Sequence, residues 1–303
     1  MTVMHSMYRE AGKVEVDGQN CIRCGKCVDL CTIDVLKMTD GGVTVEDDNP
    51  FGCVSCGHCM MVCPNGCITV TGRGASPEDL VPLPPPEERA TADALAALMQ
   101  SRRSIRRFSD REVDKSDIAR VVEMAASAPM GIPPWDAGCV TVLGREKVRE
   151  LAAEIIKGYE GFLKIFRPWL LSMMRPFTKK ATYEQFRYFI RPLAELYAGS
   201  YRKGRDVLFY DAPAVMIFHH SPYAQVVDVT IACTYAMLAA ESLGLGTTII
   251  GGAPPILQRN KALCKKLGIP SGNTPTIALI LGHPDVQFRR AIRRRFSSVE
   301  TVC

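Results

Sequence analysis

Eight cysteines near the N-terminus repeat one spacing twice. The pattern C-x2-C-x2-C-x3-C is formed by Cys21, Cys24, Cys27 and Cys31, and again by Cys53, Cys56, Cys59 and Cys63. Each cysteine of the second set lies 32 residues after its counterpart, and Gly57 follows Gly25 at the same interval. Such periodicity indicates an internal duplication. Thiolates at this spacing are metal ligands, so we predict a pair of metal centres.

The spacing favours two [4Fe–4S] clusters. In such a run the first three thiolates hold one cubane, and the fourth projects away to reach the other cluster. The predicted ligand sets are Cys21, Cys24, Cys27 and Cys63 for the first cluster, and Cys53, Cys56, Cys59 and Cys31 for the second. A pair of four-cysteine zinc sites is the alternative, but zinc sites usually present two separated C-x2-C pairs. Residues 10–71 resemble the bacterial two-cluster ferredoxins.

The chain has 303 residues, of which 47% are apolar and 23% are charged, the composition of an ordinary globular protein. No run of about 18 apolar residues occurs, so we expect no membrane-spanning helix. Residues 1–16 contain no apolar segment of the kind found in secretion signals. Thirteen cysteines without such a signal favour metal binding over disulfides. We therefore expect a cytoplasmic protein.

The chain divides into three predicted parts. Residues 1–71 form the two-cluster domain. Residues 72–90 are rich in proline and acidic residues, which favours a semi-rigid polyproline spacer. Residues 91–303 form a second, larger domain, within which residues 157–205 form a helical, basic and aromatic insert.

Helical and strand patterns alternate in the larger domain. Thr91 is a candidate N-cap for a helix that extends to Gln100, and Asp114 for one that ends before Pro129. Strand-like runs cover residues 139–143, 214–218, 247–250 and 276–281, and a long helical pattern covers residues 226–243. No G-x-G-x-x-G follows a strand, so no Rossmann nucleotide site is predicted. The predicted fold class is α+β, with helices flanking a mostly antiparallel sheet.

Five short motifs follow one another in this domain. They are residues 101–108 (SRRSIRRF), 128–131 (APMG) with Pro134-Trp135, 211–213 (DAP), 243–247 (LGLGT) and 281–284 (LGHP). In this order they resemble the nitroreductase family of FMN enzymes over about residues 91–295. They resemble in particular the family members that carry an N-terminal two-cluster ferredoxin unit. The resemblance implies a nitroreductase-like α+β sandwich, bound FMN, and a homodimer in which the partner chain completes each FMN pocket.

The resemblance also implies where FMN is held. Its phosphate and ribityl chain would contact Arg102, Arg103 and Ser104, and guanidinium forks suit phosphate oxygens. The C-terminal arginines that return to the phosphate correspond to Arg290 and Arg294, with three further arginines close by. The flavin ring would lie against Gly251 and Gly252 and against the segment Pro129, Met130 and Gly131. That segment lacks the asparagine and glutamine of many family members, so backbone amides would replace them. No catalytic side chain is predicted, because the flavin supplies the hydride chemistry.

The insert is basic and aromatic. It holds eleven Lys or Arg against three Glu, and 11 of the 22 aromatic residues. Residues 1–71, by contrast, count five basic against nine acidic residues. Four interpretations stay open at this point: core packing by aromatic residues at helical spacing, a lid over a flat or anionic substrate, a docking surface for an acidic electron carrier, and a membrane-surface contact by residues 162–177. Pro168 and Pro176 weigh against the membrane contact because they interrupt any long helix.

The predicted function is a reductase that passes electrons from an external donor, through two [4Fe–4S] clusters and FMN, to a small organic substrate. Nitroaromatics, quinones and activated alkenes are the expected substrates, and ferredoxin or NAD(P)H is the expected donor. The alternative is an electron-transfer or redox-sensing flavoprotein without an organic substrate. No nucleic-acid partner is expected, because no binding motif accompanies the basic residues.

Overall fold

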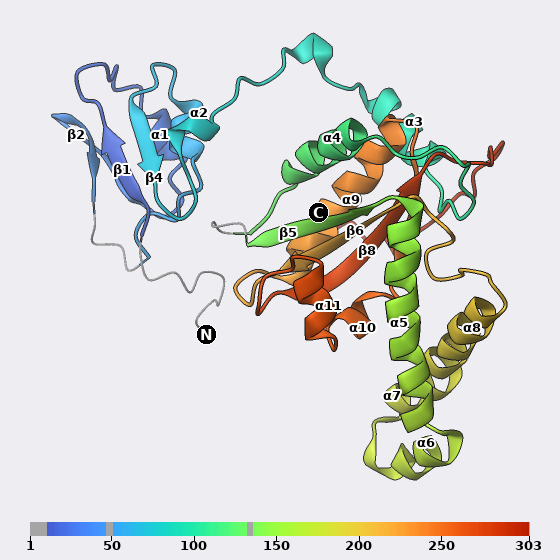
Figure 1. Cartoon of the computed structure of the whole chain (residues 1–303). Coiled ribbons are helices and arrows are strands. Elements are labelled where there is room, and N and C mark those ends of the chain that lie inside the picture. The colour runs from blue at the N-terminus through green and yellow to red at the C-terminus, as the bar shows by residue number, and fades with distance from the viewer. Residues whose placement is uncertain (1–10, 47–50, 132–135, 303) are drawn as a thin grey trace.

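A computed structural model describes residues 11–46, 51–131 and 136–302. Figure 1 shows two units connected by an extended segment. We call the described part of residues 11–71 the cluster unit and residues 92–302 the sheet unit. Pro134 and Trp135 of the second motif lie outside the described residues.

The cluster unit contains two copies of a helix followed by a strand. The first copy is α1 (Lys26–Asp29) and β2 (Leu36–Thr39), and the second is α2 (His58–Val62) and β4 (Ile68–Thr71). β4 pairs antiparallel with β1 (Lys13–Val16), and β2 pairs antiparallel with β3 (Gly42–Val45). Both helices and both strands start 32 residues apart, so the duplication of the cysteines extends to the fold.

The loops that carry the cysteines share one backbone shape. Gly25 and Gly57 precede α1 and α2 with φ angles of 76° and 72°. Glycine adopts this left-handed conformation without steric cost. Two residues earlier, Arg23 and Ser55 both have a φ of 56°. The chain therefore curls in the same way twice, which places three closely spaced cysteines around one centre in each half.

The connecting segment contains two short 3-10 helices, η1 (Pro77–Asp79) and η2 (Pro86–Glu88). Ser76 caps η1 by accepting a hydrogen bond from the Glu78 amide at 3.2 Å. The segment then enters α3 (Ala92–Ser101), where the Thr91 hydroxyl accepts a hydrogen bond from the Ala94 amide at 3.2 Å. The helix predicted to begin at Thr91 is thus confirmed, together with its N-cap.

Four strands form the sheet of the larger unit. They are β5 (Ala137–Leu143), β6 (Ala214–His220), β7 (Gly246–Ile250) and β8 (Thr274–Gly282), in the spatial order β5-β6-β8-β7. All three pairings are antiparallel. The predicted antiparallel sheet and its four strands are confirmed.

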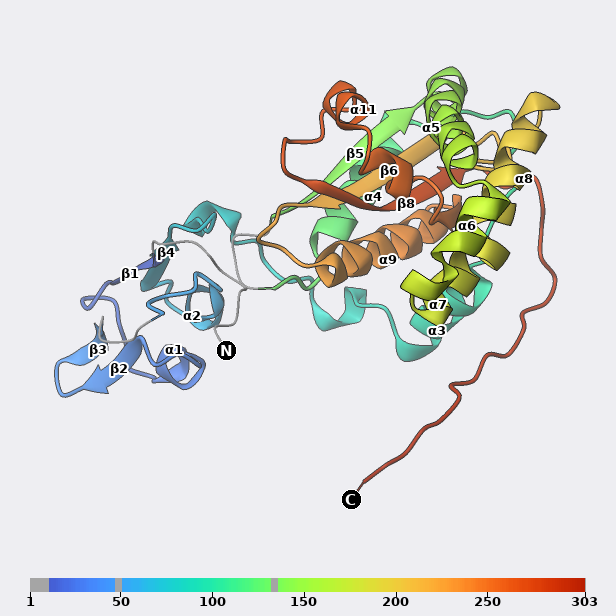
Figure 2. The same ribbon diagram turned by 90° about the horizontal axis from the view of Figure 1, so that it is seen from below.

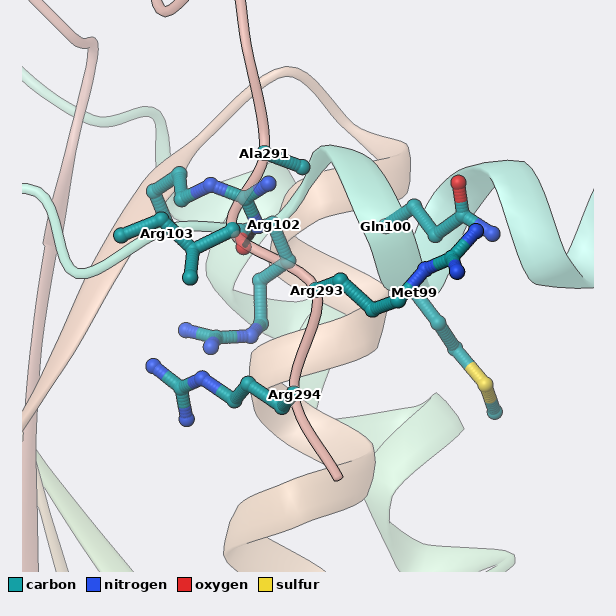
Figure 3. Close-up of a pocket in the computed structure, with 8 residues that line it drawn as sticks. Met99, Gln100, Arg102, Arg103, Ala291, Arg293 and Arg294 are labelled. Atoms are coloured by element: carbon teal, nitrogen blue, oxygen red, sulfur yellow. Dashed lines mark hydrogen bonds between the residues drawn. The ribbon is translucent and has the colours of Figure 1, made fainter.

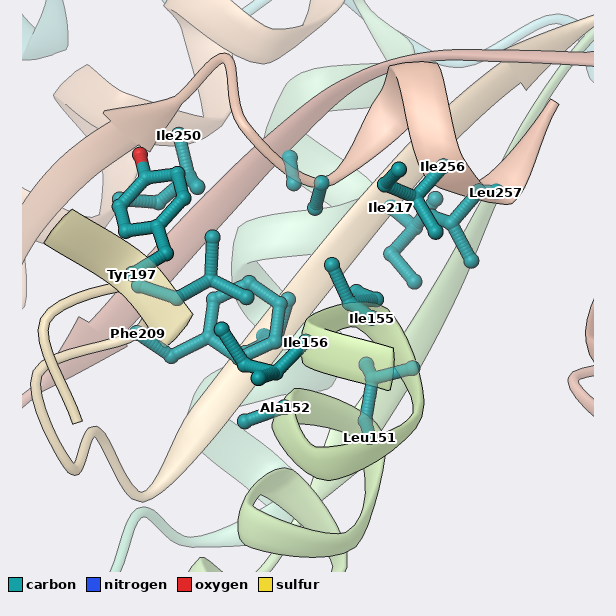
Figure 4. Packing of buried hydrophobic residues seen from close by; sticks show 14 of the residues in the cluster. Leu151, Ala152, Ile155, Ile156, Tyr197, Phe209, Ile217, Ile250, Ile256 and Leu257 are labelled. Carbon is teal, nitrogen blue, oxygen red and sulfur yellow. The ribbon is translucent and has the colours of Figure 1, made fainter. Parts of the chain in front are cut away.

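Helices cover both faces of this sheet, as Figure 2 shows. One face packs against α4 (Lys115–Ala126) and α9 (Val226–Ser242). The other packs against α5 (Arg145–Ile165), α8 (Arg191–Arg202), α10 (Pro254–Leu257) and α11 (Lys261–Lys266). Along β6, Met216 and Phe218 face the first group while Val215 and Ile217 face the second, as the period of two in a strand requires. Figure 4 shows Ile217 packed with Ile155 and Phe209 in the second core.

One predicted cap differs. The helix α4 begins after Asp114 as expected, but the Asp114 side chain makes no capping hydrogen bond. Its carboxylate instead lies 3.9 Å from the Arg111 guanidinium. The Asp114 side chain therefore forms an exposed ion pair instead of a helix cap.

Between β5 and β6 the chain leaves the sheet through helices. The long helix α5 is followed by α6 (Pro168–Met174), η3 (Arg175–Phe177), α7 (Lys180–Gln185) and the π-helical segment η4 (Phe186–Ile190), and α8 returns to the sheet. Pro168 is the first residue of α6, the helix position that tolerates a missing N–H. None of the described helices is long and apolar enough to cross a membrane.

Candidate functional site

Two hollows in the cluster unit are lined by the predicted cluster ligands. The first is lined by Cys21, Cys24, Cys27 and Cys63. The second is lined by Cys31, Cys53, Cys56 and Cys59. Each hollow thus gathers three cysteines of one repeat and the fourth of the other. The structure brings each predicted ligand set together.

The chemistry of these thiols suits a bound cluster. Burial, together with the neighbouring thiols of Cys53 and Cys56, raises the pKa of Cys59 to about 12. Burial also raises the pKa of Cys27, with added contributions from Cys63 and Cys21. Only thiolates coordinate metal, so binding of a cationic cluster core must displace these protons.

The spread of the thiols separates a cluster from a zinc ion. Across residues 11–46, 51–131 and 136–302, no group of three or more Cys, His, Asp or Glu side chains is placed to hold a single metal ion. The four cysteines of each set instead line one shared hollow. Three cysteines of one run with the fourth of the other form the ligand set of a cubane, whereas zinc sites usually take two separated C-x2-C pairs.

Backbone amides point at the ligand sulfurs. The amides of Arg23 and Ser55 each donate to the sulfur two residues earlier at 3.4 Å, and the Cys67 amide donates to Cys63 Sγ at 3.2 Å. Hydrogen bonds of this kind tune cluster potentials. Cys67, which lies outside the cysteine repeat, is 5% exposed, and burial raises its pKa to about 11. The spacing gave no sign that this ninth thiol would lie against a ligand.

A hollow in the sheet unit is lined by arginines from two distant segments. Arg102 and Arg103 follow α3, and Arg293 and Arg294 come from the C-terminal segment. Figure 3 shows the guanidinium groups of Arg102 and Arg294 pointing the same way. Of the two C-terminal arginines predicted, Arg294 lines this hollow, whereas Arg290 is exposed and is absent from its lining. Arg293 was not predicted, because five arginines within seven residues offered no pattern to choose among them.

These arginines lack counterions. Burial lowers the pKa of Arg102, and the nearby guanidinium of Arg294 lowers it further, while Glu241 acts in the opposite direction. In the described part of the chain, no carboxylate lies within ion-pair distance of the four lining arginines. Like charges gathered without a partner favour a bound anion, and phosphate matches the guanidinium fork. The hollow is therefore a candidate anion site.

Ser104 connects this hollow to the sheet. It forms a parallel bridge with Thr247 of β7, and the Ile105 amide donates to the Thr247 carbonyl at 2.9 Å. The Thr248 hydroxyl donates to the Ile105 carbonyl at 2.6 Å. The segment of Arg102, Arg103 and Ser104 is thus fixed along the start of β7.

Gly251 and Gly252 follow the end of β7, four to five residues from Thr247, or about 13–16 Å in an extended strand. The two glycines differ in surroundings. A Cβ on Gly251 would have no atom within 4 Å, whereas one on Gly252 would lie 2.7 Å from the Tyr197 hydroxyl oxygen. Gly251 thus leaves space for a ligand, and Gly252 is required by packing.

Gly131 lies far from the arginines in the same chain. Its amide donates to Asp228 Oδ1 at 3.1 Å, near the start of α9. Ser101, beside Arg102, donates to Glu241 Oε1 at 3.0 Å, near the end of α9. The 13 residues between these two anchors span about 20 Å of helix. The structure therefore separates Pro129, Met130 and Gly131 from the arginine hollow. Sequence reasoning missed Asp228, because its capping box with Gln225 departs from the usual Ser/Thr and Glu/Gln pairing.

Two histidines end β6. Asn273 Nδ2 lies 2.9 Å from His219 Nδ1, and burial lowers the pKa of His219, with His220 adding to the effect. His220 Nδ1 lies 2.7 Å from the Ser221 carbonyl oxygen. The Nδ1 atom of each ring thus has a partner within the fold, whereas His220 Nε2 is buried without one among the described residues.

Two four-cysteine hollows, followed by an antiparallel α+β unit with a candidate anion site lined by arginines, define the class of iron–sulfur redox proteins. The family model for a 4Fe-4S dicluster domain matches residues 20–67, and that for the nitroreductase family matches residues 99–283. The second match covers more than half of the 303 residues. The chain belongs to the nitroreductase family, with a two-cluster unit at its N-terminal side. The predicted fold and resemblance are confirmed.

The chain is similar to two curated proteins. It is 26% identical over 211 residues to a 4-nitrobenzoate reductase of Nocardioides sp. (strain LMS-CY), covering 64% of this chain and 82% of the relative. It is 26% identical over 185 residues to an FMN reductase (NAD(P)H) of Bacillus subtilis (strain 168), covering 60% of this chain and 62% of the relative. A crystal structure of a nitroreductase with bound FMN from Bacteroides fragilis NCTC 9343 superposes with a TM-score of 0.53 at 18% identity. That match covers 69% of this chain and 98% of the other, and it shows the shared fold.

Proposed function

We propose that this protein is an iron–sulfur flavoprotein oxidoreductase that reduces a small organic substrate at FMN. Electrons would reach FMN from a low-potential donor through the two [4Fe–4S] clusters. The observation that carries this proposal is the arginine hollow, in which Arg102, Arg103 and Arg294 gather with no carboxylate of the described residues at ion-pair distance. An FMN phosphate would supply the missing negative charge.

The residues present fit FMN along β7. Arg102, Arg103 and Arg294 would hold the phosphate, Ser104 would add a hydroxyl contact, and Gly251 would leave room for the ring. Once bound, FMN supplies both one-electron and hydride chemistry, which clusters alone cannot deliver to an organic molecule. The protein's part is to bind and orient the cofactor on a strand that the sheet holds rigid.

The relatives and the cluster unit support a substrate class and two electron donors. The similarity to a 4-nitrobenzoate reductase supports a nitroaromatic substrate, and quinones and activated alkenes accept hydride in a comparable way. The name of the Bacillus relative supports NAD(P)H as a donor, whereas the cluster unit supports ferredoxin.

A homodimer would complete the FMN site. The separation of about 20 Å along α9 leaves Gly131 out of reach of the arginine hollow in one chain. A second copy could bring its own residues 129–131 to the ring. We therefore propose a homodimer with two FMN and four clusters.

The experiment compares wild-type protein with Arg102→Ala. Loss of one charge-assisted contact costs about 1.5–3 kcal/mol, so FMN should dissociate about 10- to 150-fold more readily while the iron content stays unchanged. Turnover of a nitroaromatic, quinone and alkene panel with reduced ferredoxin or NAD(P)H tests the activity. Unchanged FMN affinity would refute the phosphate site. Full FMN and iron loading without turnover of any panel member would favour the electron-transfer alternative.

A further inference from the structure

The tip of the insert is an exposed surface of aromatic and basic side chains. We define the insert tip as residues 166–190, which comprise α6, η3, α7 and η4. Trp169, Phe177 and Tyr188 are 59%, 89% and 68% exposed. Figure 1 places α6 and α7 at the end of α5, away from the sheet. Exposed aromatic groups of this size mark interaction sites more often than solvated surface.

The insert tip carries a net positive charge. Its single acidic residue, Glu184, lies 3.9 Å from Lys180. Four other basic residues have no carboxylate within ion-pair distance in the described part of the chain: Arg167, Arg175, Lys179 and Arg187. Arg187 instead lies over the rings of Tyr183 and Tyr188, 5.9 and 5.7 Å from their centroids. The partner of such a surface should be acidic and should expose apolar groups of its own.

The cluster unit has these properties. Residues 1–71 carry five basic and nine acidic residues, and the thiolates around each cluster add further negative charge. Asp17, Asp29 and Asp34 are exposed. Ile22, which lines the first cluster hollow, and Met61 of α2 are both 61% exposed. The cluster unit therefore presents apolar side chains beside carboxylates, complementary to the tip.

The base of the insert lies against the proposed ring end of the FMN site. Tyr159 of α5 donates a 2.6 Å hydrogen bond to the Gly252 carbonyl. Only six residues of α5, about 9 Å, separate Tyr159 from the end of the helix at Ile165. A body held on the insert tip would thus lie on the ring side of the cofactor.

The connecting segment is long compared with the insert helix. Its 19 residues, 72–90, can span about 60 Å when extended. The whole of α5, 21 residues, measures about 31 Å. The segment therefore exceeds the length of the helix that carries the tip away from the sheet.

We propose that the insert tip is the docking surface for the acidic cluster unit of the same chain. This inference rests on the proposed function, because docking would bring a cluster to the ring side of FMN. Charge complementarity would guide the encounter and aromatic contacts would hold it. Docking should therefore weaken as salt rises.

The test uses the full-length protein loaded with clusters and FMN. A tip variant carries Arg167→Gln, Arg175→Gln and Lys179→Gln, and a control variant carries Lys115→Gln, Lys261→Gln and Lys265→Gln, which are exposed residues outside the insert. Carbodiimide joins lysine amines to carboxylates. Cross-links from Lys164 and Lys180, which both variants retain, to the cluster unit therefore report docking. Rapid mixing with a reductant of the clusters reports the rate at which the flavin is reduced.

The wild-type and control proteins should give cross-links between the insert and the cluster-unit carboxylates within one chain. In the tip variant these cross-links should be lost, and flavin reduction should slow about tenfold and lose its salt dependence.

Absent cross-links, or a tip variant that matches the control, would overturn the proposal. So would a tip variant that becomes monomeric with unchanged flavin reduction, which would assign the tip to contact between copies. Binding of the tip to phosphatidylserine vesicles in place of the cross-links would also overturn it. Cross-linking does not need FMN, so a failure of the FMN proposal would be seen separately, as loss of flavin with intact cross-links.

Discussion

The hydroxyl of Tyr159 donates a 2.6 Å hydrogen bond to the carbonyl oxygen of Gly252. This bond ties α5 to the loop after β7. Tyr197 of α8 packs against the same loop at Gly252, and its ring centroid lies 5.2 Å from that of Tyr159. Two tyrosines of the insert therefore fix the loop that follows the strand proposed to carry FMN.

The two glycines of this loop should respond differently to alanine. Gly252→Ala places a methyl group 2.7 Å from the Tyr197 hydroxyl oxygen, so we expect a loss of about 1–3 kcal/mol in unfolding free energy. Gly251→Ala adds its methyl group to open space, so it should leave stability unchanged while weakening FMN binding. Urea unfolding and FMN titration measure the two effects. Equal stability losses in both variants would contradict this assignment.

The structure also distinguishes two C-terminal arginines. Arg294 lines the hollow beside Arg102, whereas Arg290 is exposed and outside that lining. Arg294→Ala should weaken FMN binding by about 1.5–3 kcal/mol, and Arg290→Ala should bind FMN as the wild type does. Equilibrium dialysis of FMN at fixed salt provides the measurement. A loss caused by Arg290→Ala alone would mean that the C-terminal segment takes another path when FMN is bound.

Much of the fold was predictable because local and long-range signals agreed. The repeat of 32 residues recurs in the starts of α1 and α2 and of β2 and β4. The four strand-like runs became the four strands, since each is a short apolar segment and helices cover both faces of the sheet. The Asp114 cap was wrong because the sequence cannot show that a nearby arginine competes for the carboxylate.

The site was harder to predict because its parts are distant in sequence. The contact of Arg294 with the Arg102 region joins segments about 190 residues apart, and nothing periodic links them. The roles of Tyr159 and Tyr197 depend on how an insert folds back on a glycine loop. The ligand sets of the clusters could be predicted, because three ligands of each lie within seven residues and the geometry of a cubane dictates the fourth.

The ninth cysteine of the cluster unit provides a control for the ligands. Cys63→Ser should remove one cluster, lowering iron from about eight to about four ions per chain. Cys67→Ser should keep the full iron content, because its backbone amide still donates to Cys63 Sγ and the serine hydroxyl can replace the hydrogen bond of the Cys67 thiol to Cys63. Iron and acid-labile sulfide analysis after anaerobic purification measures both. Loss of a cluster in Cys67→Ser would assign the ninth thiol a ligand role.

His219 should make the stability of the sheet unit depend on pH. Burial holds the pKa of His219 below its ordinary value of 6.5, and the 2.9 Å contact with Asn273 Nδ2 is a hydrogen bond only while Nδ1 carries no proton. As the pH falls below about 6.5, the unfolded chain takes up the proton first, so stability present above this pH is lost. The wild type should therefore lose more unfolding free energy between pH 7.5 and pH 5.5 than His219→Gln does. Identical losses in urea titrations at the two pH values would show that this histidine does not contribute.

Arg73 distinguishes the surroundings of the two clusters. It follows Gly72, whose Cβ position lies 3.5 Å from Gly12 Cα, and the Gly12 amide donates to the Cys53 carbonyl at 2.7 Å. Its Nε is buried without a hydrogen-bond partner in the described structure. Residue 41, the counterpart of Arg73 in the first repeat, is glycine. The second cluster therefore has a partly buried cation close to Cys53 that the first cluster lacks at the equivalent place.

A cation beside a cluster stabilises its reduced, more negative state, so Arg73 should hold the second cluster at a higher potential than it would otherwise have. In Arg73→Gln that potential should fall by on the order of 30–60 mV, where about 59 mV is a tenfold change in a one-electron equilibrium. The first cluster should keep its potential. Arg23→Gln is the matched control, because its guanidinium is exposed and donates to the Asp40 carbonyl at 3.1 Å, so solvent screens its charge. A redox titration followed by electron paramagnetic resonance separates the two couples. An equal shift of both clusters in Arg73→Gln, or a larger shift in Arg23→Gln, would show that local burial of the charge does not set the difference.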